Sequence, residues 1–327
     1  MLFGCDEIER RMNEAGKAKE PFLFAVDFEM REGFFVRDPL SQQEILFDIK
    51  GISNAASSVI SGIAKSESYL FEAFPEDYEA YLRRFNIVME GLQRGDSYLT
   101  NLTIKTPLRS SLSLEEIFHF GKAAYKLCLP GKWVCFSPEC FVRIARRKIF
   151  SFPMKGTIDA RLSDARNIIL NDPKETAEHN TIVDLLRNDL SRVATSVKVN
   201  RFRYIDRLET DRGPILQVSS EIEGTLPEGY LKNIGTLFFE LLPAGSVSGA
   251  PKGATLDIIR KAEKEPRGYY TGVAGYFDGE KLESFVLIRF IGQQGSAFFF
   301  RSGGGVTAQS NSKKEYEESI RKIYLPF

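Results

Sequence analysis

The stretch SFPMKGTIDA at Ser151–Ala160 follows a strand-like run and predicts a bend at the end of a strand. Pro153 fixes the backbone before Lys155, and Gly156 after it allows the backbone to approach a neighbouring group closely. The lysine lies among apolar neighbours. It is therefore either an exposed side chain in a surface bend, as most lysines are, or a desolvated amine that acts as a nucleophile.

The composition is that of an ordinary globular protein. The chain has 327 residues, 43% of them hydrophobic and 27% charged, with 44 Lys and Arg against 44 Asp and Glu. A net charge of zero argues against a nucleic acid or an anionic membrane surface as the main partner. No apolar run approaches the ~20 residues of a membrane span, and the polar start is not that of a signal peptide, so we expect a cytoplasmic protein.

Cysteine and histidine are too sparse to suggest a redox or transition-metal site. The chain has 4 Cys, whose spacings match neither a zinc pattern nor a disulfide framework, and 2 His. Any metal is therefore expected to be bound by carboxylates, which suits magnesium.

Apolar and aromatic runs separated by turns predict strands at both ends of the chain. Residues 1–70 are expected to form a short helix and then strands, and Ser53–Ser68, rich in Ser, Ala and Gly, to form a loop. Tyr269–Val306 predicts a three-stranded meander. Arg289 lies in its second, apolar strand, where a buried arginine pairs with an acid or binds a carboxylate. The meander ends at Gly303–Gly305, which indicates either an anion-binding nest or a plain turn.

Apolar positions at a period of 3.6 residues and recognisable caps predict helices between these strands. The clearest start is Asp172–Glu175, which combines a cap, a proline at the first helical position and a carboxylate at the third. This helix is expected to run to Asp189, before a short strand at Ile215–Ile222. The other predicted helices are Pro75–Arg94, Ser113–Leu129, Gly229–Leu242, Ala254–Lys264 and a last helix that starts with a capping box at Ser312–Glu315.

Four carboxylates stand out by their positions. Glu139 lies in a turn between two aromatic strands, where it is either a solvated corner or a general acid. Glu178 lies on the apolar stripe of its helix and needs a partner there, either an arginine or a metal ion. Glu315 and Glu318 share one helical face with Lys322. Glu318 and Lys322 have the spacing of an exposed i, i+4 ion pair.

The stretch PAGSVSGAPK at Pro243–Lys252 places small residues directly before a predicted helix. Backbone N–H groups at such a place are suited to holding an anion. The stretch is not a P-loop, because no Gly-Lys-Ser/Thr follows its first glycine at the required spacing.

Together, these motifs resemble the chorismate-utilising enzymes, which include the anthranilate, isochorismate, salicylate and aminodeoxychorismate synthases, over Phe85–Tyr324. The motifs that carry the resemblance are GDSYLTNL, SPE, PMKGT, DPKETAEHNTIVDLLRNDLSRVA, PAGSVSGAPK, RGYYTGVAGYFD, LIRF, SGGGV and EYEESIRK. The resemblance implies a single large α/β (α+β) domain with two stacked, largely antiparallel β-sheets flanked by helices. We expect residues 1–75 to form a strand-rich N-terminal segment packed on this fold, and residues 76–327 to form the chorismate-binding catalytic domain.

Three positions distinguish members of the family. Lys155 lies where aminodeoxychorismate synthases have a lysine, their proposed covalent nucleophile, and where anthranilate synthases usually have alanine. Leu99 lies where isochorismate and salicylate synthases have a lysine that activates water. Gln217 replaces a histidine of anthranilate synthases and several relatives, which argues against pyruvate elimination. The resemblance therefore favours component I of aminodeoxychorismate synthase, on the path to para-aminobenzoate and folate.

For this branch, the resemblance implies that Lys155 adds to C2 of chorismate and expels the C4 hydroxyl, which Glu139 protonates. Ammonia then attacks C4 and expels the lysine. The resemblance also implies that Glu178 and Glu318 hold Mg²⁺ against the ring carboxylate, with Glu315 as a neighbour. The implied substrate-binding residues are Gly156, Thr157, Ser246, Tyr270, Arg289, Gly303, Gly305 and Lys322.

The chain carries no glutaminase signature, so the resemblance implies a separate glutaminase subunit that delivers ammonia. Two other interpretations remain open. One is component I of anthranilate synthase, in which Lys155 would have no covalent role. The other is a non-catalytic nucleotide-binding module built on the glycine-rich stretches. No glycine motif in the chain has Walker or dinucleotide spacing, which argues against the module.

Overall fold

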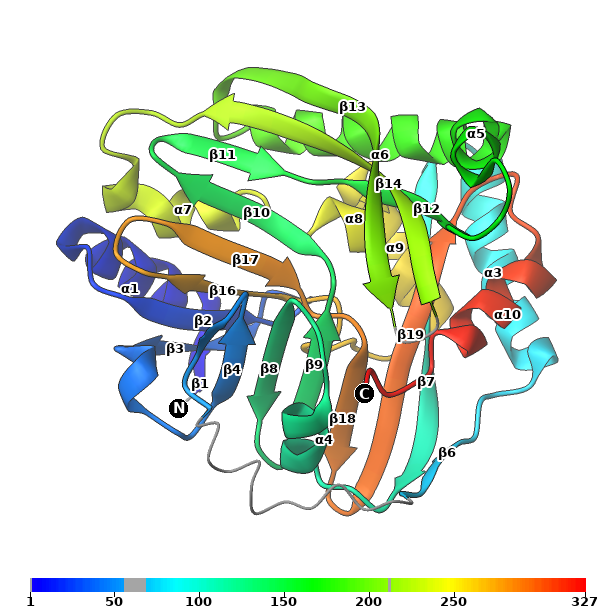
Figure 1. Ribbon diagram of the computed structural model, residues 1–327, viewed down its shortest axis with the longest axis horizontal. Coiled ribbons are helices and arrows are strands. Elements are labelled where there is room, and N and C mark those ends of the chain that lie inside the picture. The colour runs from blue at the N-terminus through cyan, green and yellow to red at the C-terminus, as the bar shows by residue number, and fades with distance from the viewer. Residues whose placement is uncertain (1, 56–68, 211–212) are drawn as a thin grey trace.

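Two β-sheets form the centre of the computed structural model, which describes residues 2–55, 69–210 and 213–327 (Figure 1). Within these residues the first sheet has ten strands and the second has nine. In both sheets the neighbouring strands run antiparallel. The predicted fold class, a mixed α/β domain with two antiparallel sheets, is therefore confirmed.

The first sheet contains, in spatial order, β1 (Leu2–Gly4), β3 (Glu32–Arg37), β2 (Phe22–Val26), β16 (Val273–Phe277), β17 (Leu282–Val286), β10 (Cys140–Ala145), β11 (Lys148–Ser151), β14 (Gly213–Thr225) and β12 (Met154–Asp159), with β13 (Thr195–Thr210) paired to β14. The second contains β15 (Gly249–Ala250), β7 (Leu99–Ser110), β19 (Ala297–Val306), β18 (Phe290–Gln294), β9 (Trp133–Ser137), β8 (Tyr125–Leu129), β4 (Leu46–Ile49) and β5 (Ile52–Ser53), with β6 (Phe71–Ala73) paired to β7.

Helices cover the outer faces and the ends of the sheets. The helices are α1 (Cys5–Ala18), α3 (Tyr78–Gln93), α4 (Leu114–Phe120), α5 (Ala165–Asn171), α6 (Pro173–Ser191), α7 (Ile234–Phe239), α8 (Gly245–Ser248), α9 (Lys252–Glu263) and α10 (Ser312–Arg321), with short 3₁₀ turns η1 (Pro39–Ser41) and η2 (Tyr230–Asn233). α1 and α7 pack together, α6 lies on β12–β14, and α3, α9 and α10 gather beside β7 and β19 (Figure 1). Among the described residues, none of these helices combines the length and the apolar character that a membrane crossing requires.

The sheets stack on a core that buries β2 on both faces. Phe22, Phe24 and Val26 face α1 and α7, whereas Leu23 and Ala25 face the second sheet. Each fully buried side chain of this size contributes about 1.5–3 kcal/mol. Because β2 also pairs with β16, the N-terminal strands are part of the same sheet as C-terminal ones. The boundary proposed at residue 75 stays a prediction.

Two helix starts follow from their caps. Asp172 caps α6 by accepting a hydrogen bond from the backbone N–H of Glu175, as the sequence predicted. The predicted start of α3 at Pro75 is wrong, because Asp77 caps the helix and its first residue is Tyr78. The loop predicted over Ser53–Ser68 lies mostly in residues 56–68, outside the described residues.

The helix predicted from the Ser113 capping box is too long. The capping box is present, but α4 ends at Phe120, with Gly121 as its C-cap. Tyr125–Leu129 forms β8, paired on one side with β4 and on the other with β9. Sheet pairing therefore decides the structure of this apolar run, and not its helical propensity.

Three other boundaries also differ from prediction. The helix predicted over Gly229–Leu242 is divided into η2 and α7, since Asn233 at the junction has non-helical dihedrals. The strand predicted at Ile215–Ile222 is longer, because β13 pairs with β14 along most of its length. The predicted capping box of the last helix is wrong: Asn311 caps α10, and the Ser312 hydroxyl bonds to the phenol of Tyr78 at 2.7 Å.

The predicted meander Tyr269–Val306 has the wrong topology. β16 and β17 belong to the first sheet and β18 and β19 to the second, so the chain crosses between the sheets after Val286. Arg289 lies in this crossing with a φ of 53°, and not in a strand. Gly303–Gly305 lie inside β19 and form neither a turn nor a nest. There the lack of side chains permits close approach, since a Cβ at Gly303 would lie 2.4 Å from the Leu102 carbonyl oxygen.

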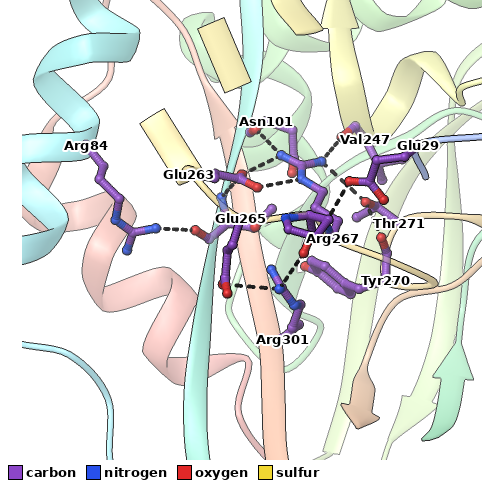
Figure 2. A network of polar contacts seen from close by, with 12 residues as sticks. Glu29, Arg84, Asn101, Val247, Glu263, Glu265, Arg267, Tyr270, Thr271 and Arg301 are labelled. Atoms are coloured by element: carbon purple, nitrogen blue, oxygen red, sulfur yellow. Dashed lines mark hydrogen bonds and ion pairs between the residues drawn. The ribbon is translucent and has the colours of Figure 1, made fainter. Parts of the chain in front are cut away.

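A buried polar network joins the two sheets (Figure 2). Arg267, 3% exposed, donates from Nε and Nη2 to the two carboxylate oxygens of Glu263 at 2.8 and 2.6 Å. It also donates to the carbonyl oxygens of Asn101 on β7 and Val247 on α8, and to the Thr271 hydroxyl before β16. One guanidinium therefore connects both sheets and α8.

Replacement of this arginine tests the network. We expect Arg267→Met to lower the free energy of unfolding by about 3–5 kcal/mol, because the Glu263 carboxylate stays buried without its partner. Urea denaturation followed by far-UV circular dichroism measures the change. Arg10→Met is the matched control, because Arg10 pairs with Glu7 and Glu14 on the exposed face of α1. An equal effect of the two variants would contradict the prediction.

Candidate active site

One cavity of about 610 Å³ lies where β12 and β19 meet the ends of α6, α8 and α10. It brings together every residue that the sequence predicted for the site. These are Glu139, Lys155, Gly156, Thr157, Glu178, Ser246, Tyr270, Arg289, Gly303, Gly305, Glu315, Glu318 and Lys322. Their roles stay predictions, but their convergence from distant parts of the sequence is a property of the fold.

Lys155 projects from an irregular part of β12. The pairing of β12 with β14 shifts register between Met154 and Thr157, and Gly156 has a φ of 80°. The Lys155 amine lies 4.0 Å from Glu178 Oε2, and its side chain is 27% exposed. A Cβ at Gly305 of β19 would lie 3.7 Å from the same amine, so the lysine reaches from the first sheet to the second.

Glycine at position 305 also leaves room for Leu99. A Cβ there would come within 2.9 Å of Leu99 Cδ1 as well as near the Lys155 amine. Leu99 is 4% exposed. An apolar side chain therefore lies where the lysine amine approaches β19, which limits the access of water from that side.

Glu139 follows β9 and holds its carboxyl in the cavity wall. Only part of its surface reaches solvent, and burial raises the pKa of the carboxyl. The hydrogen bond from Ser246 and the positive charges of Lys155, Arg289 and Lys322 lower this pKa in opposition. A carboxyl with a raised pKa is suited to donating a proton.

Ser246 is bound to Glu139. Its hydroxyl donates to Glu139 Oε1 at 2.5 Å, a short hydrogen bond that fixes the carboxyl against α8. The family resemblance implied that Ser246 binds the substrate. In the structure its proton is directed at the neighbouring acid, so its first contact is with Glu139.

Positive side chains line the wall formed by the sheet crossing and α10. Lys322 donates to the Gly303 carbonyl oxygen at 2.7 Å and pairs with Glu318 at 2.7 Å. Burial lowers the Lys322 pKa, while Glu318 opposes that shift. Arg289 lies in the crossing, next to buried Tyr270, whose pKa burial raises to about 12. These groups are suited to binding carboxylates.

The predicted magnesium ligands Glu178, Glu315 and Glu318 line the same cavity. The point that a Cβ of Gly304 would occupy lies 3.7 Å from both Glu315 Oε2 and Glu318 Oε1. Across the described ranges, no group of three or more His, Cys, Asp or Glu side chains is arranged to hold a metal ion. Mg²⁺ usually binds one or two protein carboxylates and takes its other ligands from substrate and water, so Glu318 with one further carboxylate of this cavity is a donor set that suits it.

His179, the residue after Glu178, points away from the cavity. It is 1% exposed, and its Nε2 lies 2.7 Å from the Ser220 hydroxyl of β14. Burial, with the positive charges of Arg203 and Lys155, lowers its pKa to about 4. This neutral imidazole therefore holds α6 against the first sheet and leaves Glu178 on the cavity side.

Several cavity residues were missed by the sequence analysis. The missed residues include Asn101, Glu175, Arg301, Ser302 and Arg321. Glu175 precedes Glu178 by three residues, and Arg321 follows Glu318 by three, so helical spacing was an available signal. Arg301 and Ser302 had no such signal, because only the pairing of β19 with β7 places them here.

Comparison with known proteins agrees with this fold. The family described as chorismate binding enzyme matches residues 62–326. The chain belongs to this family. The interpretation as a non-catalytic nucleotide-binding module is therefore not supported, and the three glycines on which it partly rested lie in a strand.

Individual relatives extend the comparison. The chain is 50% identical over 317 residues to an uncharacterised PabA-like protein of Haemophilus influenzae, covering 96% of this chain and 94% of that one. It is 30% identical over 282 residues to aminodeoxychorismate synthase component 1 of Bacillus subtilis, covering 82% of this chain and 59% of that one. The menaquinone-specific isochorismate synthase of Escherichia coli has a similar fold, with a TM-score of 0.72 at 14% identity, over 98% of this chain and 82% of that one.

Removal of the Ser246 hydroxyl tests its contact with Glu139. Because this hydrogen bond lowers the Glu139 pKa against the effect of burial, Ser246→Ala should raise that pKa further. The carboxyl would then stay protonated to a higher pH, which difference infrared spectroscopy of the free protein measures. Ser248→Ala is the matched control on α8, since the Ser248 hydroxyl donates to the Ala244 carbonyl oxygen. A Glu139 titration unchanged in Ser246→Ala would contradict the assignment.

Proposed function

We propose that the protein is the chorismate-binding component of an aminodeoxychorismate synthase, which makes 4-amino-4-deoxychorismate for para-aminobenzoate and folate. The observation that carries the proposal is that the Lys155 amine and the Glu139 carboxyl line one cavity. They supply a nucleophile and a proton donor to the same substrate. The match to the Bacillus subtilis enzyme supports the same conclusion.

In the proposed reaction, Lys155 Nζ forms a bond to C2 of chorismate while the bond from C4 to its hydroxyl oxygen breaks. Glu139 gives its proton to the departing hydroxyl, which leaves as water. Ammonia then bonds to C4, and the bond from C2 to the lysine breaks. The lysine leaves as a neutral amine, and the new ammonium group returns one proton to Glu139. The sum is chorismate plus ammonia giving aminodeoxychorismate plus water.

The cavity offers separate places for the two carboxylates of chorismate. Arg289, Tyr270 and the β19 backbone at Gly303 and Gly305 would bind one of them. Gly303 and Gly305 both line the cavity, so their backbone lies at the surface that a substrate carboxylate would contact. Lys322 would face a substrate carboxylate, with Gly156 and Thr157 along the wall. An arginine binds a carboxylate through two parallel hydrogen bonds, which fixes its orientation.

Magnesium is the proposed cofactor, held by Glu178 and Glu318 with Glu315 beside them. When bound, it would neutralise the ring carboxylate next to the carboxylates of the protein. The chain's own contribution is to present these side chains from α6 and α10 to the same cavity. Ammonia is the second substrate, and a separate glutaminase subunit is its proposed source.

Product analysis tests the lysine. The wild type, incubated with chorismate, Mg²⁺ and ammonium at mildly alkaline pH, should make aminodeoxychorismate. Lys155→Ala should lower kcat by at least about 100-fold, because the nucleophile is removed. Liquid chromatography with mass spectrometry identifies the product and detects a covalent adduct on the intact chain. Lys148→Ala is the control, since that lysine lies on β11 and pairs with Glu223 of the adjoining strand β14.

Two results would contradict the proposal. Formation of anthranilate and pyruvate by the wild type would favour anthranilate synthase and remove the covalent role of the lysine. An equal rate for Lys155→Ala and the wild type would have the same consequence for the lysine alone.

A second test concerns the magnesium ligands. Glu318→Gln should raise the Mg²⁺ concentration needed for half-maximal activity by about 10–100-fold, because a neutral amide binds this hard cation less well than a carboxylate. Titration of Mg²⁺ by calorimetry should show the same loss of affinity without turnover. Glu317→Gln on the exposed side of α10 should leave both measurements unchanged. Equal behaviour of the two variants would remove Glu318 from the ligand set.

A further inference from the structure

A second cavity, of about 70 Å³, adjoins the main one. It lies between the start of β10, the bend before β12, the inner face of α6 and α8. Its lining residues are Glu139, Cys140, Phe141, Ser151, Phe152, Pro153, Met154, Lys155, Ile182, Leu186 and Ser246. A cavity needs only about 10–15 Å³ to hold one water molecule, so this one admits a few molecules of that size and excludes a substrate with a ring.

The two cavities share part of their walls. Glu139, Met154, Lys155 and Ser246 line both. The proposed acid and the proposed nucleophile therefore stand at the boundary between the large cavity and the small one. Any molecule that passes from the small cavity to the large one does so beside Glu139, the group that protonates the C4 hydroxyl.

We propose that the small cavity, called here the ammonia pocket, binds the ammonia that attacks C4. The inference rests on the proposed function and adds to it the location of the second substrate. In the proposed reaction, C4 loses its hydroxyl next to Glu139 and then gains nitrogen. A nucleophile held on the other side of that carboxyl reaches the same carbon without crossing the space that chorismate fills.

The ammonia pocket combines an apolar part with a polar boundary. Phe141, Phe152, Pro153, Ile182 and Leu186 are apolar, and an ammonium ion would have to give up part of its hydration to lie among them. The Lys155 side chain at the boundary would repel a cation further. Neutral ammonia is also the form whose lone pair can attack carbon.

Polar groups at the boundary suit the proton balance. After the first step Glu139 is a carboxylate, which accepts a hydrogen bond from an N–H of ammonia. Ammonia forms the bond to C4, the bond from C2 to Lys155 breaks, and the surplus proton on nitrogen returns to Glu139. No oxidant, reductant or further reactant is needed.

Two leucines on one face of α6 provide a matched test. Leu186 lines the ammonia pocket, whereas Leu190, one turn further along, is buried in the same core and does not line it. Leu186→Phe should raise the KM for ammonium about tenfold and leave the KM for chorismate unchanged, because the added ring fills the pocket. Formation of the lysine adduct without ammonium, followed by intact mass spectrometry, should keep its rate. Leu190→Phe should change none of these values.

A second test enlarges the ammonia pocket and measures its selectivity for small amines, so it does not depend on fitting a larger side chain into the core. With methylamine as the probe, the wild type should discriminate against the added methyl group by at least about tenfold relative to ammonia. Leu186→Ala should reduce this discrimination severalfold and yield the N-methyl product, whereas Leu190→Ala should not. Thermal unfolding of all four variants shows which of them are folded.

The outcomes separate the two proposals. Folded Leu186 variants with the ammonium KM and the methylamine discrimination of the wild type would overturn the ammonia pocket alone. Anthranilate as the wild-type product would overturn the proposed function, and the ammonium KM values would still locate the ammonia site. A wild type that makes no ammonia-dependent product would overturn both.

Discussion

The Arg267 guanidinium is enclosed where the two sheets approach each other, and its N–H groups bind Glu263 and three other groups. The three acceptors other than Glu263 belong to residues that line the candidate site. The Asn101 carbonyl belongs to a residue paired with Gly305, Val247 follows Ser246, and Thr271 follows Tyr270. A buried ion pair returns little net stability, since desolvation of both charges offsets their attraction. Its effect here is geometric, because it fixes three parts of the cavity wall relative to one another.

The cavity exists only because the chain crosses between the sheets. β17 leaves the first sheet, the crossing carries Arg289 in a left-handed conformation, and β18 and β19 enter the second sheet. This route brings the glycines of β19 opposite the irregular part of β12. Because these glycines have no side chains, other side chains extend into the space beside them. Lys155 lies beside Gly305, and Lys322 and Glu315 lie beside Gly304. The glycines allow other groups to pack closely against β19, and they are not required by an unusual backbone conformation, because their dihedrals are those of a strand.

The sequence predicted the local features well. The cap at Asp172 and the shared helical face of Glu315 and Glu318 follow from residue spacing. The proposed site residues follow from spacing or from recognised motifs, and all of them line the cavity. The two largest failures share one physical cause, which is that tertiary pairing overrides local pattern, whereas the wrong starts of α3 and α10 are local errors about which residue caps the helix. Tyr125–Leu129 has a pattern that continues a helix until β4 and β9 pair with it. Gly303–Gly305 indicates a turn until β7 pairs with it. The partner strands lie far away in the sequence, so the residues around each segment do not reveal the pairing. The Arg267 network and the contact between Ser246 and Glu139 also join residues that are distant in the sequence.

Desolvation sets the chemistry of the cavity through one rule, which is that burial favours the neutral form of any titratable group. Burial raises the pKa of the Glu139 carboxyl and lowers that of the Lys322 amine in the same cavity. In the proposed reaction a protonated acid donates to the departing hydroxyl, and the burial of Glu139 favours that form. The Lys155 amine, in contrast, lies 4.0 Å from Glu178 Oε2 and forms an ion pair with it. Under the proposed function, Lys155 must leave this contact to reach C2 of the substrate, and a cation bound by Glu178 would compete with the lysine for the carboxylate. Glu178 would then restrain the lysine in the free protein and hold the proposed metal ion in the complex.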